Sequence, residues 1–574
     1  MTTEADEEKK EVALGRLRKA LGAQRSYLSS YEKPSEPVVY ETVRVLDDLF
    51  CRDLMEPDRP IGGDERQFRA ISTWGVNHSL KRIIPNALAS GAFRNFASRD
   101  DYQDSANDFV FNCGVLELSE RFEGWLQEGI LSGKIRICNK RGKKTTVLEL
   151  RSVASSYADE EIGQAGLRWA GEQSWIRDRS VELELEERHK TIEPELEKRV
   201  ELVEGWRVTY SSTRQIDDYF LQWAKLYLRR IFSQDMIGLE DVIGGRPFAR
   251  YLEVLAALSA RSQKHIAFAA ILRARHGSVH IRNLLTTYCR REDFIENLSS
   301  YLDADREEIG RILASFVLTG ENLDAHMRGW ETAWAPIVQA SSETLIHPIY
   351  GLDINPFLFL LTDLRSRYEL DWFRVANNRE GRWIRELAKL FDEARWQTHT
   401  RNLRLRENGK DLTDIDFVAY EVETNELALF QLKWQHPVGM DNRGRRSAGR
   451  NLLEESNRWV GAVLSWLERN GIDELMRRLT FRSASTPTVH LFVLGRYHVH
   501  LSGFDARDHR AIWSDWAHFR RAREEGSKSA TVTEIASTLQ SIVEQSRAMK
   551  DGESLMFPVG DIAVVLNPKS VPAE

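Results

Sequence analysis

The sequence has 574 residues, which is too long for a single hydrophobic core, so we expect about three domains. Hydrophobic residues make up 42% and charged residues 29% of the chain, a balance that is typical of folded globular proteins and excludes a disordered chain. The net charge of -7 excludes a protein coated uniformly with positive charge for nucleic-acid binding, but it allows a local basic surface.

The cysteines and the apolar runs exclude two further classes of protein. The 4 cysteines are scattered without Cys-x-x-Cys spacing, so we expect neither a zinc site nor a disulfide framework, which fits a reducing cytoplasm. The charged N-terminal stretch lacks the apolar core of a signal peptide, and no apolar run is long enough to cross a bilayer. These features predict a cytoplasmic protein with no membrane partner.

Residues 1–235 predict a mixed α/β region for substrate or partner recognition. A helix over 116–131 is followed by two alternating strands, and the turn between the strands carries the basic residues Lys140, Arg141, Lys143 and Lys144. Such a tip either contacts the DNA backbone, like the wing of a winged-helix module, or is a soluble turn, which is the more common case. The acidic run 181–204 is typical of an exposed helix or connector.

Residues 236–375 predict a mainly helical middle domain. Within it, residues 294–309 indicate two helices joined by a short turn, with Asp303 or Asp305 capping the second helix. This pair is either a DNA-reading helix-turn-helix or an ordinary helical hairpin. The acidic start of the second helix favours the hairpin, because phosphate would approach that end.

The next domain is placed at residues 376–505, with its boundary in the polar stretch 376–381. Apolar residues recur at helical spacing from Trp383 to Ala394 and predict an amphipathic helix. Glu386 lies on the flank of the apolar stripe, from which it can reach toward a neighbouring sheet. Glu380 and Glu393 are the alternative acidic residues, and each of the three could equally be a solvated surface charge.

The most informative stretch, residues 413–435, predicts a β-hairpin around a polar tetrapeptide at 423–426. A two-residue turn at Thr424 and Asn425 would set Asp416 opposite Lys433. Because side chains alternate along a strand, Asp416, Gln431 and Lys433 then project from the same face of the sheet.

A carboxylate, an amide oxygen and an ammonium on one face suit phosphodiester hydrolysis. Asp416 and Gln431 can hold a divalent ion through hard oxygen ligands, and Lys433 can steady the attacking water and the developing charge. The order of Asp on one strand and Gln-x-Lys at the end of the next resembles the PD-(D/E)XK nuclease superfamily, in its Mrr-type restriction endonuclease branch with Gln in place of Glu.

This resemblance covers roughly residues 376–505 and implies a C-terminal αβββαβ restriction-endonuclease-like domain in a multidomain α+β protein. It implies a Mg²⁺-dependent nuclease, with Mn²⁺ as a substitute ion, and a third acidic ligand from the preceding helix, for which we choose Glu386. Two departures are the missing Pro before Asp416 and the neutral Gln431, which should weaken metal binding. By analogy, the branch implies DNA as the substrate, a role in bacterial defence against foreign DNA, and either a defence-system partner or a homodimer.

A basic segment follows the hairpin and is predicted to be a loop that contacts phosphates. It contains Arg443, Arg445, Arg446 and then Arg450, and guanidinium groups fork well onto phosphate oxygens. The alternative is a surface loop without a ligand. Helices from about 451 to 479 and a strand at 489–494 complete the domain, and residues 506–574 are expected to pack on this core or to form an oligomer contact.

Other catalytic patterns are absent from the sequence. It contains no Gly-x-x-x-x-Gly-Lys-Ser/Thr phosphate loop, no Gly-x-Ser-x-Gly and no His-Glu-x-x-His. The leading hypothesis is therefore a Mg²⁺-dependent DNA endonuclease. The alternatives are a non-catalytic DNA-binding or scaffold protein with a degenerate nuclease fold, and an RNA endonuclease.

Overall fold

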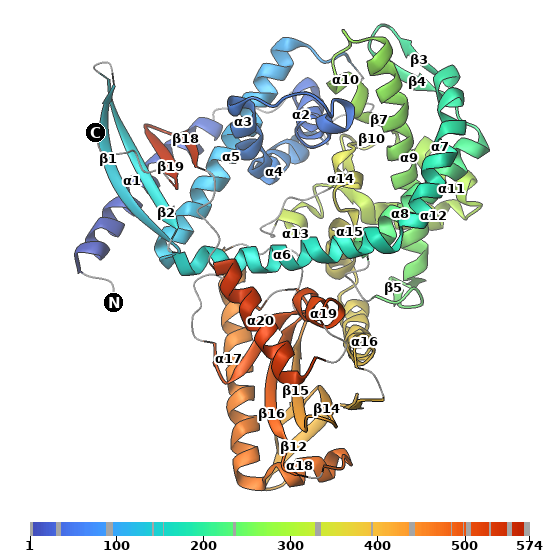
Figure 1. The fold of residues 1–574 in the computed structure, drawn as a ribbon. Helices are drawn as coiled ribbons and strands as arrows, with labels where there is room; N and C mark the ends of the chain where they lie inside the picture. Colours follow the sequence, from blue (N-terminus) through green and yellow to red (C-terminus); the bar gives the residue numbers. More distant parts are fainter. Residues whose placement is uncertain are drawn as a thin grey trace.

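The structure is a computed structural model that describes residues 4–29, 36–87, 96–140, 143–152, 154–232, 237–327, 335–391, 394–434, 442–483, 485–497, 499–500, 507–526, 530–547 and 554–567. It is a mixed α+β protein with several small sheets, as predicted. In Figure 1, helix α6 (Ala154–Arg177) runs between a large upper part and a smaller lower part. Among the described helices, none is both long and apolar enough to cross a bilayer.

The upper part begins with the N-terminal helices and the long β1–β2 hairpin. Its first elements are α1 (Glu4–Ser29), α2 (Glu36–Met55), α3 (Gly63–Trp74), α4 (Val76–Ala87), α5 (Asp100–Glu128), β1 (Leu131–Lys140), β2 (Lys143–Ser152), α6, α7 (Arg179–Arg199), β3 (Val200–Val203), β4 (Arg207–Tyr210) and α8 (Arg214–Phe232). The acidic run at 181–204 is largely helix α7, as predicted.

A four-stranded sheet brings together segments from both ends of the chain. Its order is β1-β2-β19-β18, where β18 spans Leu555–Val559 and β19 spans Ile562–Leu566. Strand β19 runs parallel to β2, and Leu148 and Val564 are fully buried in the core that this sheet shares with α1 and α5. The terminal strands therefore do not pack on the 376–505 core, where we expected them.

The middle region is mainly helical but also holds a small sheet that its sequence did not indicate. Its elements are β5 (Val242–Ile243), β6 (Arg246–Pro247), α9 (Phe248–Arg275), α10 (Arg282–Leu285), β7 (Thr287–Arg290), α11 (Arg291–Leu302), α12 (Arg306–Leu313), the 3-10 helix η1 (Ala314–Phe316), β8 (Val317–Leu318), α13 (Leu323–Met327), β9 (Ile337–Gln339), β10 (Thr344–His347), α14 (Tyr350–Asp353) and α15 (Pro356–Arg367). Strands β7, β10, β9 and β8 form the sheet in that order.

Helices α11 and α12 form the predicted helical pair. The Asp305 carboxylate accepts a hydrogen bond of 2.8 Å from the backbone N–H of Glu308, so Asp305 is the cap of α12, whereas Asp303 ends α11 in a left-handed conformation. Phe294 and Ile309 face the core. Both helices use their apolar sides for packing in the middle region, as in an ordinary helical hairpin.

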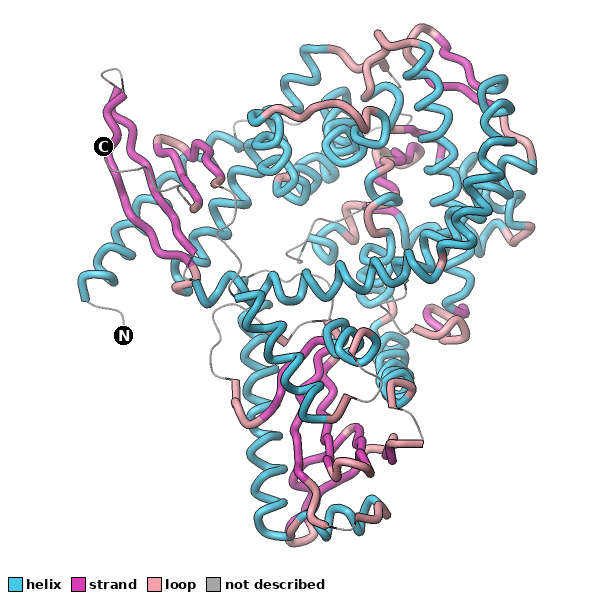
Figure 2. Tube along the Cα trace, in the orientation of Figure 1, coloured by secondary structure: helices cyan, strands magenta, loops and turns pink. Residues whose placement is uncertain are grey.

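The lower part is a five-stranded sheet with helices on both faces (Figures 1 and 2). Its elements are α16 (Glu369–Ala388), β11 (Trp396–His399), β12 (Leu403–Glu407), β13 (Lys410–Ile415), β14 (Phe417–Glu421), β15 (Glu426–Lys433), α17 (Asn442–Asn470), α18 (Ile472–Leu479), β16 (Thr488–Gly495), β17 (Ala511–Asp515), α19 (Trp516–Glu524) and α20 (Val532–Arg547). The order is β11-β14-β15-β16-β17, with β14 antiparallel to β15, and β15, β16 and β17 mutually parallel.

Alternation along β14 divides the lower part into two apolar layers. Phe417 and Ala419 face the core formed with α16, α19 and α20, whereas Val418 and Tyr420 face the core formed with α17 and α18. The segment 396–407 holds two strands, β11 in the main sheet and β12 in a separate ribbon with β13.

Helix α16 passes without interruption through the polar stretch in which we placed a domain boundary. Its first half buries Trp372 and Val375 in the core of the middle region, and its second half buries Trp383 and Leu387 in the lower core. Arg379, between them, is also buried, with its guanidinium over the Trp372 ring. The polar residues at 376–381 are therefore part of a shared helix and not of a linker.

Candidate functional site

The β14–β15 hairpin brings two of the predicted site residues together. Its turn has four residues, Val422 to Asn425, so Val418 pairs with Leu429 and the register differs by two residues from the predicted one. Asn425 adopts a left-handed conformation with φ of 57°, and the Tyr420 hydroxyl donates to its side-chain oxygen. Because a shift of two keeps every side chain on its face, the predicted grouping on one face survives.

Asp416 is buried at the end of β14 and is held by the neighbouring strand. The backbone N–H of Asp416 donates to the Phe430 carbonyl at 3.0 Å. Its Oδ2 accepts a bond of 2.6 Å from the backbone N–H of Leu432 and another from the Gln431 side-chain amide. The carboxylate and the amide are thus in direct contact at the edge of the sheet core.

Two further carboxylates act electrostatically on Asp416. The pKa of Asp416 is raised to about 7, mainly by burial and also by the charges on Glu380 and Asp414, while the hydrogen bond from the Leu432 N–H and the Lys433 charge lower it. Burial and the Asp414 charge also raise the pKa of Glu380, which the Lys433 charge lowers. Glu380, Asp414 and Lys433 are therefore near enough to Asp416 for their charges to act on its carboxyl.

Asn402 links the neighbouring ribbon to this group. Its amide donates to Asp414 Oδ2 at 2.7 Å and lies 3.5 Å from Asp416 Oδ1. Asn402 was not selected from the sequence, because a single Asn in a loop does not show which distant residues it will contact. Its two contacts orient both carboxylates toward the same space.

Lys433 has a carboxylate partner on α17. Its Nζ lies 3.0 Å from Glu455 Oε2, and its side chain is 22% exposed. A lysine within an otherwise apolar strand needs a charged or polar partner. Glu455 is that partner, and the ion pair holds the ammonium on the face from which Asp416 and Gln431 project.

Glu386 does not join this group. It pairs with Lys389 at 2.6 Å on the exposed side of α16, and it is not among the charges that shift the pKa of Asp416. Six residues along a helix correspond to about 600° of rotation, so Glu380 and Glu386 point in different directions. Glu380, one of our alternatives, is the helix carboxylate closest to the predicted role, and Glu393 lies outside the described residues.

The predicted basic loop is the start of a helix. The first turns of α17 contain Arg443, Arg445 and Arg446. Arg has a high helix propensity, so this segment continues the helix toward its N-terminus. The side chains of these three residues lie outside the described part of the chain, while Arg450, about two turns into the helix, is exposed. The basic segment is therefore the N-terminal part of a helix and not a loop.

The basic β1–β2 tip projects from the upper part, far to the left in Figure 1. Lys140 pairs with Lys143 at the end of the ladder, and Lys144 is exposed. Arg141, together with the side chains of Lys140 and Lys143, lies outside the described residues. Contact of this tip with DNA stays a prediction.

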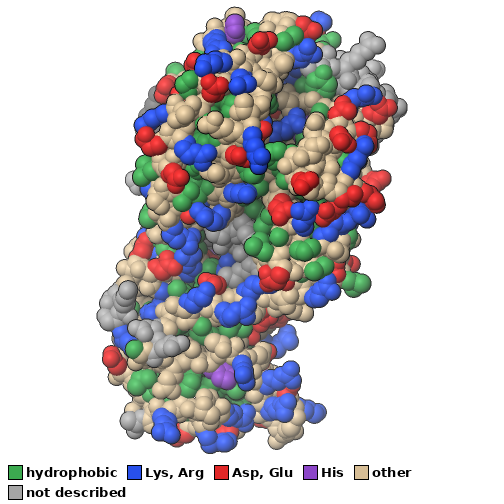
Figure 3. All heavy atoms as spheres, turned by 90° about the vertical axis from the view of Figure 1, so that its right-hand side faces the viewer, with side chains coloured by type: hydrophobic (Ala, Val, Ile, Leu, Met, Phe, Trp, Pro, Cys, Tyr) green, Lys and Arg blue, Asp and Glu red, His purple; other side chains and the backbone are tan. Residues whose placement is uncertain are grey.

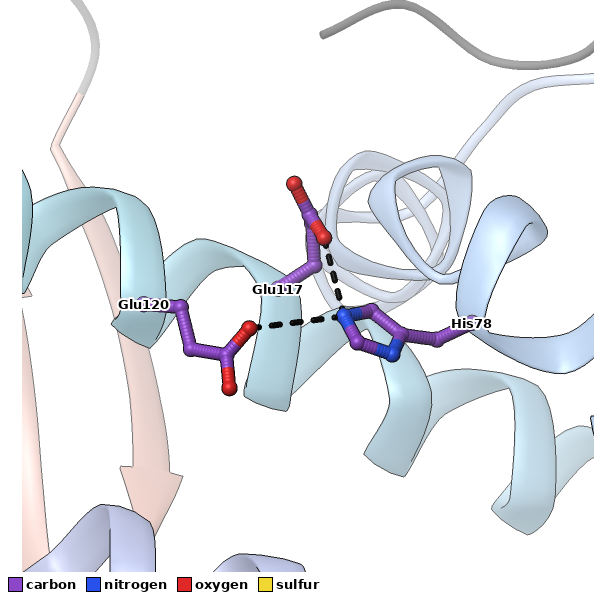
Figure 4. Close-up of side chains that lie close together, drawn as sticks. All are labelled: His78, Glu117 and Glu120. Atoms are coloured by element: carbon purple, nitrogen blue, oxygen red, sulfur yellow. Dashed lines mark ion pairs between the residues drawn. The ribbon is translucent and has the colours of Figure 1, made fainter. Parts of the chain in front are cut away.

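A second group of titratable side chains lies in the upper part and was missed from the sequence. His78 Nε2 of α4 lies 2.9 Å from Glu117 Oε2 and 3.5 Å from Glu120 Oε2, both on α5 (Figure 4). Burial lowers the pKa of His78, but the bonds and charges of the two glutamates prevail and raise it to about 9. Arg121 pairs with Glu117 at 2.6 Å and Arg25 with Glu120 at 2.7 Å, so this group is a neutralised ion network.

The group around His78 and the group around Asp416 differ in how close their possible metal-ligand atoms lie to one another. Among the described His, Cys, Asp and Glu residues, only His78, Glu117 and Glu120 form a set of three whose ligand atoms all lie within 4.8 Å of one another. The group around Asp416 is wider and includes an amide. Of the two groups, only the one around Asp416 holds a carboxyl whose pKa is raised by neighbouring acids.

Comparisons of the chain with protein-family models, with curated proteins and with solved structures found no match. The fold of the lower part and the Asp416 group are therefore the features that bear on the class of protein.

Proposed function

We propose that the protein is a divalent-metal-dependent nuclease of the PD-(D/E)XK type that acts on DNA, with its site at the end of the β14–β15 hairpin. The observation that carries the proposal is the contact between Asp416 and Gln431 on the face of the sheet that also bears Lys433. A sheet with β14 antiparallel to β15 and β15 parallel to β16, flanked by α16 and α17, agrees with the αβββαβ order that the sequence resemblance implies.

The residues of this group fit Mg²⁺ or Mn²⁺. Carboxylate and amide oxygens are hard ligands, which these ions prefer. Three acids whose mutual repulsion raises a pKa form a site that a divalent cation would stabilise. Asp416 and Gln431 would hold the ion, the latter through its amide oxygen, with Glu380 or Asp414 taking the position that we assigned to Glu386.

Side chains of the protein would orient the water, the phosphate and the carboxylates of the site. A bound divalent ion would act as a Lewis acid on the phosphate and would lower the pKa of a bound water. Lys433, held by Glu455, offers its remaining ammonium hydrogens to a water or to a phosphate oxygen. Asn402 keeps Asp414 and Asp416 oriented through its amide.

The exposed basic residues around the site would position the phosphate backbone without reading its sequence. Arg404 and Arg406 of β12 are exposed, and both pair with Asp411. Figure 3 shows acidic and basic side chains interspersed over one face of the molecule. Phosphate contacts of this kind supply salt-dependent affinity.

A cleavage assay with the full chain tests this proposal. Linear, supercoiled and single-stranded DNA, and single-stranded RNA, are incubated without divalent ions and again after addition of Mg²⁺ or Mn²⁺. We expect metal-dependent cleavage of DNA that Asp416→Ala and Lys433→Ala each abolish, while a variant of the exposed lysine that follows the last residue of α16, Lys389→Ala, cleaves like the wild type. Cleavage of RNA alone would assign the RNA endonuclease alternative, and equal cleavage by Lys433→Ala would refute the site.

One observation favours a non-catalytic alternative. Gln431 donates to Asp416, and Lys433 is paired with Glu455, so each of these polar groups is satisfied by protein. A degenerate nuclease fold that only binds DNA would show this arrangement. In that case DNA binding would persist, salt-dependent and insensitive to Mg²⁺, in a protein that cleaves no substrate.

A further inference from the structure

A cavity in the middle region lies between three helices and is distinct from the Asp416 group. It has a volume of about 160 Å³ and is lined by residues of α8, α9 and α11, which lie together at the right of Figure 1. Its inner wall is apolar and buried, formed by Phe220, Ala257, Phe294 and Leu298. A cavity of about 150 Å³ is large enough to hold a benzene ring.

The polar side of the cavity carries an excess of positive charge. Arg261 and Lys264 of α9 and Asp217 of α8 all line it. Lys264 Nζ lies 2.5 Å from Asp217 Oδ1, so these two charges neutralise each other. The Arg261 guanidinium lies over the Phe294 ring at 4.8 Å and, within the described part of the chain, has no carboxylate within ion-pair distance.

The buried titratable groups beside Arg261 carry no negative charge. Burial, reinforced by the Arg261 charge, lowers the pKa of His265 to about 4 and keeps the pKa of His347 well below its usual value, so both rings are neutral. Burial raises the pKa of the Cys289 thiol to about 11, and Asp293, whose charge also acts on Cys289, is an exposed carboxylate that forms no ion pair with Arg261. A half-buried guanidinium without an ion-pair partner beside an apolar cavity attracts an anion.

We infer that this cavity is a binding site for a small monocarboxylate carried on a flat, ring-sized apolar body. The ring would fill the space between Ala257, Phe294 and Leu298, and the carboxylate would accept hydrogen bonds from Arg261. A planar carboxylate matches the fork of a single guanidinium. The Asp217 carboxylate on the same wall disfavours a dianion such as a phosphate monoester, and Asn297 and Tyr301 form the exposed rim.

Titration of the full chain with sodium benzoate, followed by ligand-observed NMR and by calorimetry, tests this inference. We expect saturable binding of one benzoate, with phenyl phosphate weaker and with neutral toluene and cationic benzamidine weaker still. Arg261→Gln should weaken benzoate binding about tenfold or more, because a hydrogen bond to a charged group contributes roughly 1.5–3 kcal/mol. Arg311→Gln, an exposed arginine on α12, is the matched control and should bind benzoate normally.

A second variant fills the cavity and leaves Arg261 unchanged. Ala257→Leu places a larger side chain on the apolar wall and should abolish benzoate binding. The variant should keep the helical circular dichroism spectrum of the wild type, which shows that it is folded. Absence of saturable binding by the wild type would overturn the inference, as would equal binding by Arg261→Gln. None of these readouts depends on nuclease activity.

Discussion

Lys433 of β15 and Glu455 of α17 form an ion pair of 3.0 Å that joins the sheet to the helix covering the face that bears Asp416 and Gln431. In the proposed site the Lys433 ammonium must be correctly placed, and the contact with Glu455 places it. The pair is partly solvated, with Glu455 57% exposed, so it contributes little to stability.

Glu455→Gln should therefore reduce cleavage without destabilising the protein. We expect a loss of about tenfold in the rate of DNA cleavage, of the size seen when positioning is impaired, against complete loss in Lys433→Ala. The measurement is single-turnover cleavage in Mg²⁺ alongside a thermal melt. Glu454→Gln, the exposed neighbour on α17, serves as the control, and equal rates in both variants would show that Glu455 has no positioning role.

Removal of the helix carboxylate should shift the titration of Asp416. The Glu380 charge raises the pKa of Asp416, so Glu380→Gln should lower it from about 7. Cleavage that requires ionised Asp416 would then begin at a lower pH than in the wild type. A pH–rate profile in saturating Mg²⁺ gives the comparison, with Glu386→Gln expected to leave the profile unchanged because Glu386 pairs with Lys389.

Asp416→Asn should stabilise the fold while abolishing activity. The folded pKa of about 7 lies above the value of 3.8 for an ordinary Asp, so the folded state binds the proton more tightly. The stability contributed by protonated Asp416 is present below about pH 4 and is lost as pH rises toward 7. Above pH 7 the variant should gain at most about 4 kcal/mol, at roughly 1.36 kcal/mol per pKa unit. Melts should therefore show a clearly larger gain at pH 8 than at pH 5.

The contact between α6 and α19 gives a prediction for the joint between the upper and lower parts. A Cβ added at Gly166 would lie 3.0 Å from Asp515 Oδ1 and 3.1 Å from the Ala517 Cβ. Gly166→Val should therefore weaken the packing of α6 on α19, lowering the melting temperature by several degrees for a loss of about 1–3 kcal/mol. Gly171→Ala, in open space on the same helix, should be neutral or stabilising, and a similar loss in both variants would contradict this account.

The β14–β15 hairpin and its flanking helices could be predicted from the alternation of apolar and polar residues and from helical periodicity. The exact residue pairing between β14 and β15 could not. The predicted turn was two residues too short, since nothing in the residues 422–426 decides between a two-residue and a four-residue turn. Asp416 and Gln431 nevertheless meet, because an even shift preserves the face. Lys433 was predicted to lie on the same face, whereas its partner Glu455 was not recognisable from its place on α17.

Other features depend on contacts between distant segments. Sequence distance from Asp416 selected Glu386, but the rotation of α16 brings Glu380 to the group instead. The parallel pairing of β19 with β2 joins segments more than 400 residues apart, and no local pattern indicates such a partner. The ion network of His78, Glu117 and Glu120 likewise arises from packing between two helices.

The pairing of β19 with β2 also sets the order in which the chain can mature. During synthesis on the ribosome, β1 and β2 emerge more than 400 residues before β19, so the inner edge of β2 stays open until residues 555–566 have been made. An open strand edge recruits other strands, and nascent chains stalled before residue 555 should aggregate or engage chaperones. Strands β18 and β19 thus complete a sheet whose first two strands are made much earlier.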